Sequence, residues 1–219
     1  MKFSDSLVGI LADKNLLKHE WYQAWNCGKV PVETLRHYAK QYYHHVKMFP
    51  RYLSATHSNC EQIQARQFLL ENLNDEEFGS ENHPELWLRF AEGMGANRHE
   101  VESTVPNQEI QDLVDAFMGF SKRSYPTGLG ALFAYEHQIP GIAQFKLEAL
   151  KNHYSIDDAA TLSFFDVHQK ADVYHTEAIS KLLDELTPDE QQAAETAARV
   201  VCNQLWKFLD GVQRTLPLQ

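Results

Sequence analysis

The sequence predicts an all-α protein, because apolar residues recur every three to four positions along most of its 219 residues. The segment that begins at Pro31 is an example, with Leu35, Tyr38 and Tyr42 on one face and the proline at a favoured first-turn position. No stretch keeps the alternation of apolar and polar residues that a half-buried strand needs. No repeat, low-complexity tract or linker divides the chain, so we predict one helical-bundle domain over residues 1–219.

Glycine and proline residues mark the predicted ends of the helices. Gly79 should end the helix that starts near residue 61, and residues 125–128 (Tyr-Pro-Thr-Gly) should separate two helices. Pro50 and Pro140 should each kink or interrupt a helix, and Thr187 should cap the last one. The first helix is expected around residue 7, and the others over 16–25, 31–49, 61–78, 85–94, 98–103, 108–122, 129–152, 157–186 and 188–216.

Charge and cysteine content exclude several classes of protein. The formal net charge is 20 − 30 = −10, which argues against a nucleic-acid-binding surface or an anionic-membrane surface. No apolar stretch approaches the ~20 residues that cross a bilayer, so a cytoplasmic protein is expected. The three cysteines are far apart and form no CxxC pair, which argues against a disulfide framework and a thiolate zinc site.

The segment FFDVHQKADVYHTEA carries the clearest chemical signal. It places His168, Asp172 and His175 at positions i, i+4 and i+7, within an arc of roughly 60° on one helix face. Apolar neighbours such as Val167 and Leu182 suggest that this face lies near a buried seam, where imidazole and carboxylate groups must be paired or ligated. The triplet alone fits a metal site and a hydrogen-bonded structural cluster equally well.

Two further segments add candidate ligands. Glu76 and His83 flank the end of a helix in LNDEEFGSENHPELW, and Glu136 stands in the apolar stretch LGALFAYEHQIP. The six residues supply three carboxylates and three imidazoles from three helices, which is a dinuclear bundle-core site in kind. Such ligands suit iron or manganese, as an Fe/Fe or an Mn/Fe pair, and two divalent ions with three carboxylates carry a net +1. A site of this kind can bind and reduce dioxygen with an external reductant.

With these residues in view, the chain resembles the CADD-like family of heme-oxygenase-like dimetal proteins, which sits beside pyrroloquinoline quinone synthase. The resemblance covers most of the chain and is carried by LRHYAKQYYHHVKMFPRYLSATH, by ENLNDEEFG with HPELW, by LFAYEHQIP, and by the triplet His168, Asp172 and His175. It implies a seven-helix bundle-like fold, two metal ions and a role in making p-aminobenzoate, the aromatic precursor of folate.

The resemblance also implies that the protein consumes its own side chains. The sacrificed tyrosine falls on Tyr22, the lysine that supplies the amino group on Lys146, and a tyrosine of the radical chemistry on Tyr135. A second such tyrosine of the family falls on Phe164, which departs from the pattern. Taken alone, Tyr22 would be a core or interface aromatic residue. Lys146 would be solvated, and a straight helix would carry it ~15 Å from Glu136.

Two other functions stay open. The metal site can act on an external small molecule, which would require a roomy apolar pocket beside it. Alternatively, the acidic surface can bind a protein partner of the death-domain type, with which the family is associated. A homodimer is also expected for this fold, with Trp25 or Trp206 as candidate contact residues.

Overall fold

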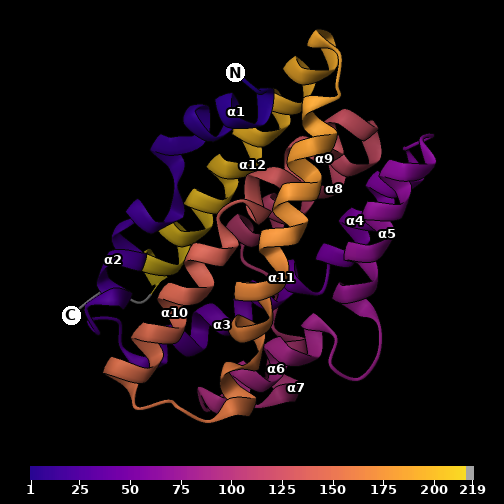
Figure 1. Ribbon diagram of the computed structural model, residues 1–219. Helices are drawn as coiled ribbons and strands as arrows, with labels where there is room; N and C mark the ends of the chain where they lie inside the picture. Colours follow the sequence, from indigo (N-terminus) through magenta and orange to yellow (C-terminus); the bar gives the residue numbers. More distant parts are fainter. Residues whose placement is uncertain (216–219) are drawn as a thin grey trace.

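The computed structural model describes residues 1–215, apart from the side chains of residues 170–173 and 215. All regular secondary structure in this part of the chain is helical, which confirms the all-α class (Figure 1). The first helices are α1 (Phe3–Leu11), α2 (Glu20–Asn26), α3 (Val32–Val46), α4 (Phe49–Ser58), α5 (Ile63–Glu77) and α6 (His83–Gly93). They are followed by α7 (Arg98–Ser103), α8 (Gln108–Arg123), α9 (Tyr125–Glu136), α10 (Ile139–Tyr154), α11 (Ala159–Asp184) and α12 (Pro188–Thr215). Two short 3₁₀ turns, Ala12–Lys14 and Leu16–Lys18, lie between α1 and α2.

Prolines begin new helices, which gives residues 1–215 more helices than the seven that the resemblance implies. Pro50 interrupts the predicted helix and lies in the first turn of α4, a helix that the sequence analysis did not predict. Pro140 occupies the same position in α10. A proline is tolerated there because the first-turn N–H groups have no partner within the helix.

The predicted break over residues 125–128 is wrong. α9 begins at Tyr125, and the Ser124 side chain caps it by accepting from the Thr127 N–H. Gly128 lies inside α9 and does not end a helix. A Cβ at this position would lie 2.4 Å from the Thr56 hydroxyl on α4. Gly130 is equally close-packed, with a Cβ position 2.1 Å from the Ala194 carbonyl oxygen on α12. Both glycines therefore permit close helix packing.

α9 is the central helix of the bundle. Every residue from Thr127 to Glu136 is buried, which is the pattern of a helix surrounded on all sides. It packs against α12, α8, α11 and α4, and α11 in turn packs against α10 and α6. The buried apolar side chains form one continuous cluster around it. Glu136 thus ends the central helix with its carboxylate inside the protein.

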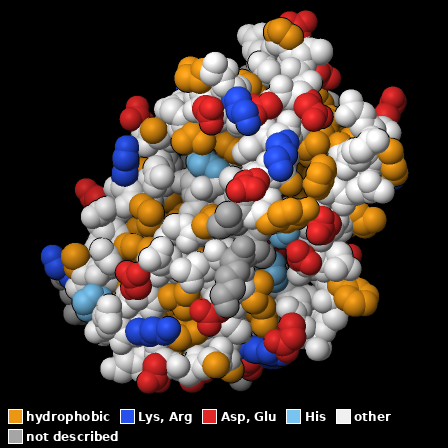
Figure 2. All heavy atoms as spheres, viewed as in Figure 1, with side chains coloured by type: hydrophobic (Ala, Val, Ile, Leu, Met, Phe, Trp, Pro, Cys, Tyr) orange, Lys and Arg blue, Asp and Glu red, His pale blue; other side chains and the backbone are white. Residues whose placement is uncertain are grey.

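Two surface properties bear on the expected partners. Within the described residues, no helix combines the length and apolarity that a membrane crossing requires. Figure 2 shows acidic and basic side chains scattered over one face, without a continuous basic patch there. Trp25 is fully buried in the core, so the structure excludes it as a contact residue of a dimer. Trp206 is half-buried and lines a surface groove with His19 and Asp210.

Candidate active site

Three of the predicted metal ligands meet in the core. Glu76 lies at the end of α5, His83 begins α6, and His168 is in the middle of α11. The Nδ1 atom of His83 is 2.8 Å from a Glu76 carboxylate oxygen, and the rings of His83 and His168 are 4.2 Å apart. Among the described side chains this is the one group of potential ligand atoms, all within 4.8 Å of one another, that could hold a metal ion.

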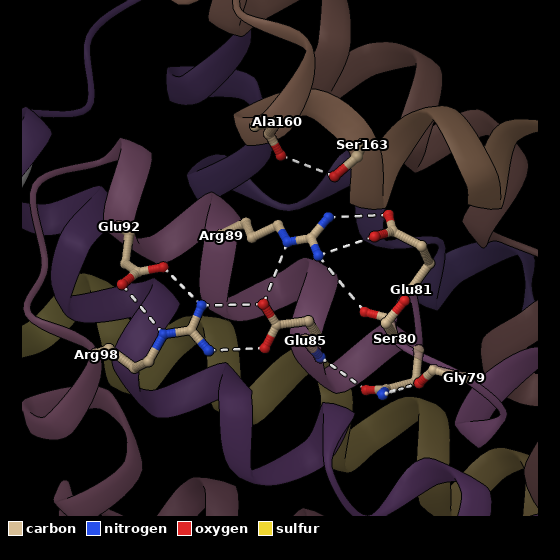
Figure 3. A network of polar contacts seen from close by, with 10 residues as sticks. Gly79, Ser80, Glu81, Glu85, Arg89, Glu92, Arg98, Ala160 and Ser163 are labelled. Atoms are coloured by element: carbon tan, nitrogen blue, oxygen red, sulfur yellow. Dashed lines mark hydrogen bonds and ion pairs between the residues drawn. The ribbon is translucent and has the colours of Figure 1, made fainter.

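The loop between α5 and α6 brings Glu76 and His83 together. Gly79 adopts a left-handed conformation with φ of 81°, which turns the chain after α5. The Asn82 side chain then caps α6 by accepting from the Glu85 N–H. Figure 3 shows Arg89 and Arg98 converging on the Glu85 carboxylate, with Arg89 also reaching back to the loop. This network fixes the start of α6 and hence the position of His83.

The ring of His168 is oriented by its own helix. Its Nδ1 atom donates to the Phe164 carbonyl oxygen at 2.6 Å, so Nε2 is the nitrogen suited to bind a metal. Burial by itself would raise the pKa of Glu76, but His83, His168 and His175 outweigh burial and lower that pKa below its usual range. Glu76 is therefore the carboxylate around which three imidazoles are arranged.

Two of the other predicted ligands, Glu136 and His175, are described, and neither belongs to the group of ligand atoms formed by Glu76, His83 and His168. Glu136 accepts from the Asn72 side-chain amide at 3.1 and 3.2 Å, and His175 is 3.1 Å from an Asp75 carboxylate oxygen. Asn72 and Asp75 are both on α5, about one turn and one residue before Glu76, respectively. The side chain of Asp172 lies outside the described residues. α5 thus carries the ligand candidate Glu76 and also the two residues that contact Glu136 and His175.

The donor set fits the metals that the sequence analysis predicted. The described candidates offer carboxylate and imidazole groups and no thiolate, and all are buried. The contact of buried Glu76 with His83 is the kind of pairing that a divalent ion would replace. The residues therefore suit iron or manganese, whereas their role as ligands stays a prediction.

Lys146 lies in an aromatic cage and not in solvent. α9 ends at Glu136 and α10 starts at Ile139, so Glu136 and Lys146 do not lie on one continuous helix. Its Nζ donates to the Tyr38 hydroxyl at 2.9 Å and lies 5.1 to 5.7 Å from the centroids of six rings. The rings belong to Tyr22, Trp25, Tyr38, Tyr42, Trp87 and Phe165. Burial lowers the pKa of Lys146 to about 7.

The two candidate tyrosines, Tyr22 and Tyr135, are connected through Tyr38 and Tyr42, and the four form one series. The Tyr22 and Tyr38 hydroxyls are 3.5 Å apart, and the Tyr38 ring stacks on Tyr42 with centroids 5.3 Å apart. The Tyr42 hydroxyl donates to the Tyr135 hydroxyl at 3.0 Å, and Tyr135 precedes Glu136. Burial raises the pKa of Tyr22, although the hydrogen bond with Tyr38 opposes this shift. All four tyrosine side chains are buried and shielded from solvent.

A small cavity joins the cage to the metal cluster. Its lining includes Tyr42, Tyr135 and Lys146 from the cage and the tyrosine series, together with Phe164 and His168. The space open to the centre of a water molecule is about 10 Å³, which is room for about one water. Phe164 packs against His168 with ring centroids 4.0 Å apart, and it brings no hydroxyl to the site.

Several residues of the site were missed by the sequence analysis. Tyr38 and Tyr42 are four positions apart on α3, and Asn72 and Glu76 are four positions apart on α5. That spacing places each pair on one helix face, but it is also the spacing of ordinary core residues. Buried His45 packs edge-on against Tyr135, with ring centroids 4.8 Å apart. His44 and His45 are adjacent, and the sequence around them does not indicate which of the two faces the site.

Comparisons with known proteins point in one direction. The model of a family described as iron-containing redox enzymes matches residues 36–206. The 4-aminobenzoate synthase of Nitrosomonas europaea is 39% identical over 224 residues, with 96% of this chain and 90% of that protein covered. The 4-aminobenzoate synthase of Chlamydia muridarum is 37% identical over 212 residues, with the same shares covered.

Solved structures agree on the fold. A domain of unknown function with a heme oxygenase-like fold, from Shewanella denitrificans, is similar with a TM-score of 0.82. The alignment covers 96% of this chain and 90% of that one, at 18% sequence identity. At this identity the likeness establishes the heme-oxygenase-like fold and no more.

Proposed function

The chain belongs to the family of iron-containing redox enzymes, and from this premise we propose that it is an oxygen-dependent 4-aminobenzoate synthase. In this proposal the product, also called p-aminobenzoate, is made from the ring of Tyr22, and Lys146 supplies the amino group. Each chain is then consumed in a single turnover. The proposal is supported by the names of relatives that match nearly the whole chain.

The observation that carries the proposal is the position of Lys146. Its Nζ lies 5.3 Å from the centroid of the Tyr22 ring, inside a cage that excludes solvent. p-Aminobenzoate differs from a tyrosine side chain by a nitrogen in place of the phenol oxygen and a carboxylate in place of the Cβ carbon. A lysine amine held against that ring is the group that such an exchange requires.

The protonation state of Lys146 favours this role. An amine can attack as a nucleophile only when it is neutral, because protonation occupies its lone pair. Burial among aromatic rings lowers the Lys146 pKa to about 7, so a large share of the amine is neutral near neutral pH. The hydrogen bond to Tyr38 orients the nitrogen within the cage.

The proposal assigns the metal centre to six residues. Glu76, His83 and His168 would hold one ion, and Glu136, His175 and Asp172 would complete the site for a second, as an Fe/Fe or an Mn/Fe pair. When bound, the metals would supply the oxidising power of dioxygen, with electrons from an external reductant. Tyr135, next to Glu136, would be oxidised before Tyr22, and the electron that it loses would be replaced from the direction of Tyr22. Asn72 would orient the Glu136 carboxylate.

An external organic substrate is less consistent with the cavity. Among the described residues, the space beside the metal cluster is about 10 Å³, far below the ~300 Å³ of a usual ligand pocket. The arene of Tyr22 is already part of the cage, so no entry path for an aromatic substrate is required. Oxygen is small enough to use such a cavity.

Location and assembly complete the proposal. We propose a cytoplasmic homodimer, with half-buried Trp206 as the remaining candidate contact residue after the exclusion of Trp25. A death-domain-type protein partner stays a prediction that no observed surface supports. Dimerisation is tested by sedimentation of the wild-type protein and a Trp206→Glu variant.

The proposed function is tested with protein labelled with heavy tyrosine. Metal-free protein is loaded with iron, manganese or both, mixed with oxygen and a reductant, and assayed for p-aminobenzoate by mass spectrometry. Heavy product at no more than one equivalent per chain is expected. Tyr22→Phe should make none while it keeps the metal content of the wild type. Unlabelled product, or product from Tyr22→Phe, would overturn the use of Tyr22.

A further inference from the structure

We propose that Tyr42 is a redox relay that connects Tyr135, beside the metal centre, to the pair formed by Tyr38 and Tyr22. This inference rests on the proposed function, since it concerns how the Tyr22 ring is oxidised from a distance. The proposed function assigns no role to Tyr42. Its position between the two ends of the tyrosine series is what points to one.

The first contact is a hydrogen bond with a suitable direction. The Tyr42 hydroxyl donates to the Tyr135 hydroxyl at 3.0 Å, so the Tyr42 hydrogen already points at the Tyr135 oxygen. If Tyr135 loses an electron and a proton, its oxygen becomes the acceptor of that hydrogen. The two phenols can therefore exchange a hydrogen atom without a change of geometry.

The second contact is a stacked pair of rings. The Tyr42 and Tyr38 ring planes are inclined by 19° with centroids 5.3 Å apart, and the Tyr38 hydroxyl is 3.5 Å from that of Tyr22. Each ring is at most 5% exposed, so water has little access to a radical on any of them. Tyr42 is the member that contacts both Tyr135 and Tyr38.

No second phenol offers a parallel path among the described residues around His168. Phe164 packs on His168, and it also contacts Trp87 with ring centroids 4.8 Å apart. A phenylalanine ring has no hydroxyl hydrogen to give, and it is much harder to oxidise than a phenol. Trp87 donates its indole N–H to the Ala39 carbonyl oxygen, which ties its proton to the backbone.

The relay conserves atoms and electrons. Tyr135 would lose one electron and one proton to a one-electron oxidant of the oxygen-derived class, which bound metal would supply. The Tyr42 O–H bond then breaks as a new Tyr135 O–H bond forms. Tyr42 regains an electron and a proton from Tyr38, and Tyr38 regains both from Tyr22. The net result is one oxidised Tyr22 and three restored phenols.

The first test compares two neighbouring tyrosines of α3. Tyr42→Phe should lower the yield of p-aminobenzoate at least about tenfold, and freeze-quench EPR should find a tyrosyl radical that persists at Tyr135. Tyr43→Phe is the control, because Tyr43 lies under Lys47 and outside the series. Metal content and helicity are measured for both variants. Wild-type yield from Tyr42→Phe at unchanged metal content would overturn the relay while the proposed function stands.

The second test keeps the phenol in place. 3-Aminotyrosine is more easily oxidised than tyrosine, so at position 42 it should trap the radical, give an aminotyrosyl EPR signal and stop product formation. At position 43 it should leave the yield unchanged and give no such signal. Absence of the signal at position 42, in protein that makes product, would overturn the relay. Absence of heavy product from the wild type would instead refute the proposed function.

Discussion

The Nζ of Lys146 donates to the Tyr38 hydroxyl at 2.9 Å, and burial alone accounts for the lowered pKa of this lysine. No carboxylate among the described side chains forms an ion pair with it. Six aromatic faces provide cation–π attraction in place of a counter-ion. A lysine in this setting costs stability when it is charged, and this cost depends on pH.

Replacing Lys146 should change how stability depends on pH. The folded pKa is about 7 and the ordinary value is 10.5, so between these pH values the unfolded chain binds a proton that the folded chain does not. The free energy of unfolding therefore gains a contribution that rises with pH, by up to about 1.4 kcal/mol per pH unit. Lys146→Met should remove that contribution, as urea unfolding of the metal-free protein at pH 7, 8 and 9 will measure.

Lys151 provides the matched control for this prediction. It is exposed on the same helix, and Lys151→Met should keep the pH dependence of the wild type. The same slope in the wild type and in Lys146→Met would show that the lysine does not titrate within this window. The buried cage would then hold a charged amine at neutral pH.

Glu76 should be needed for metal binding. Its carboxylate is next to His83, and His168 completes the group of ligand atoms. Glu76→Gln keeps the shape of the side chain but removes the charge that balances a divalent ion. We expect the iron or manganese content, measured by elemental analysis after loading, to fall at least about tenfold. Glu77→Gln, at the exposed neighbouring position, should bind metal as the wild type does.

Much of the fold was predictable from local sequence, whereas much of the site was not. The period of apolar residues gave the helices, and α7 matches its predicted range over 98–103. Residues 125–128 have the composition of a break between helices, yet they form the first turn of α9. The role of Gly128 is a close contact with Thr56 on another helix, and local sequence does not reveal such contacts.

The same distinction applies to the candidate site. The convergence of Glu76, His83 and His168 followed from residue types that are costly to bury unpaired. The burial of Lys146 depends on the turn between α9 and α10 and on rings from four other helices. Only the resemblance identified that lysine, since its local pattern is that of a solvated residue.

Asn72 should tune the affinity for metal although it is not a predicted ligand. Its amide donates to both oxygens of the Glu136 carboxylate, which fixes the orientation of that group. Loss of such a contact typically weakens metal binding by about 10- to 100-fold. We expect this range for Asn72→Ala in a competition titration with a chelator. The exposed Asn74 is the control, and equal affinities of the Asn72→Ala and Asn74→Ala proteins would contradict the prediction.

His45 should make the protein sensitive to acid. It is fully buried among aromatic rings, and neither ring nitrogen has a hydrogen-bond partner among the described residues. Burial lowers its pKa from 6.5 to about 3, although the charge of Glu76 opposes the shift. As the pH falls below 6.5, His45 binds a proton in the unfolded chain but not in the folded chain. The free energy of unfolding therefore decreases.

A substitution at this position isolates the effect. His45→Phe retains an aromatic ring and has no group to protonate, so its free energy of unfolding should fall less between pH 7 and pH 5 than that of the wild type. The difference should reach about 1 kcal/mol per pH unit at the lower end of this range. Urea unfolding of the metal-free protein measures it, with His99→Phe at an exposed site as the control. If the free energy of unfolding changes with pH in the same way for the wild type and for His45→Phe, His45 does not contribute to the acid sensitivity. Another buried group would then be its cause.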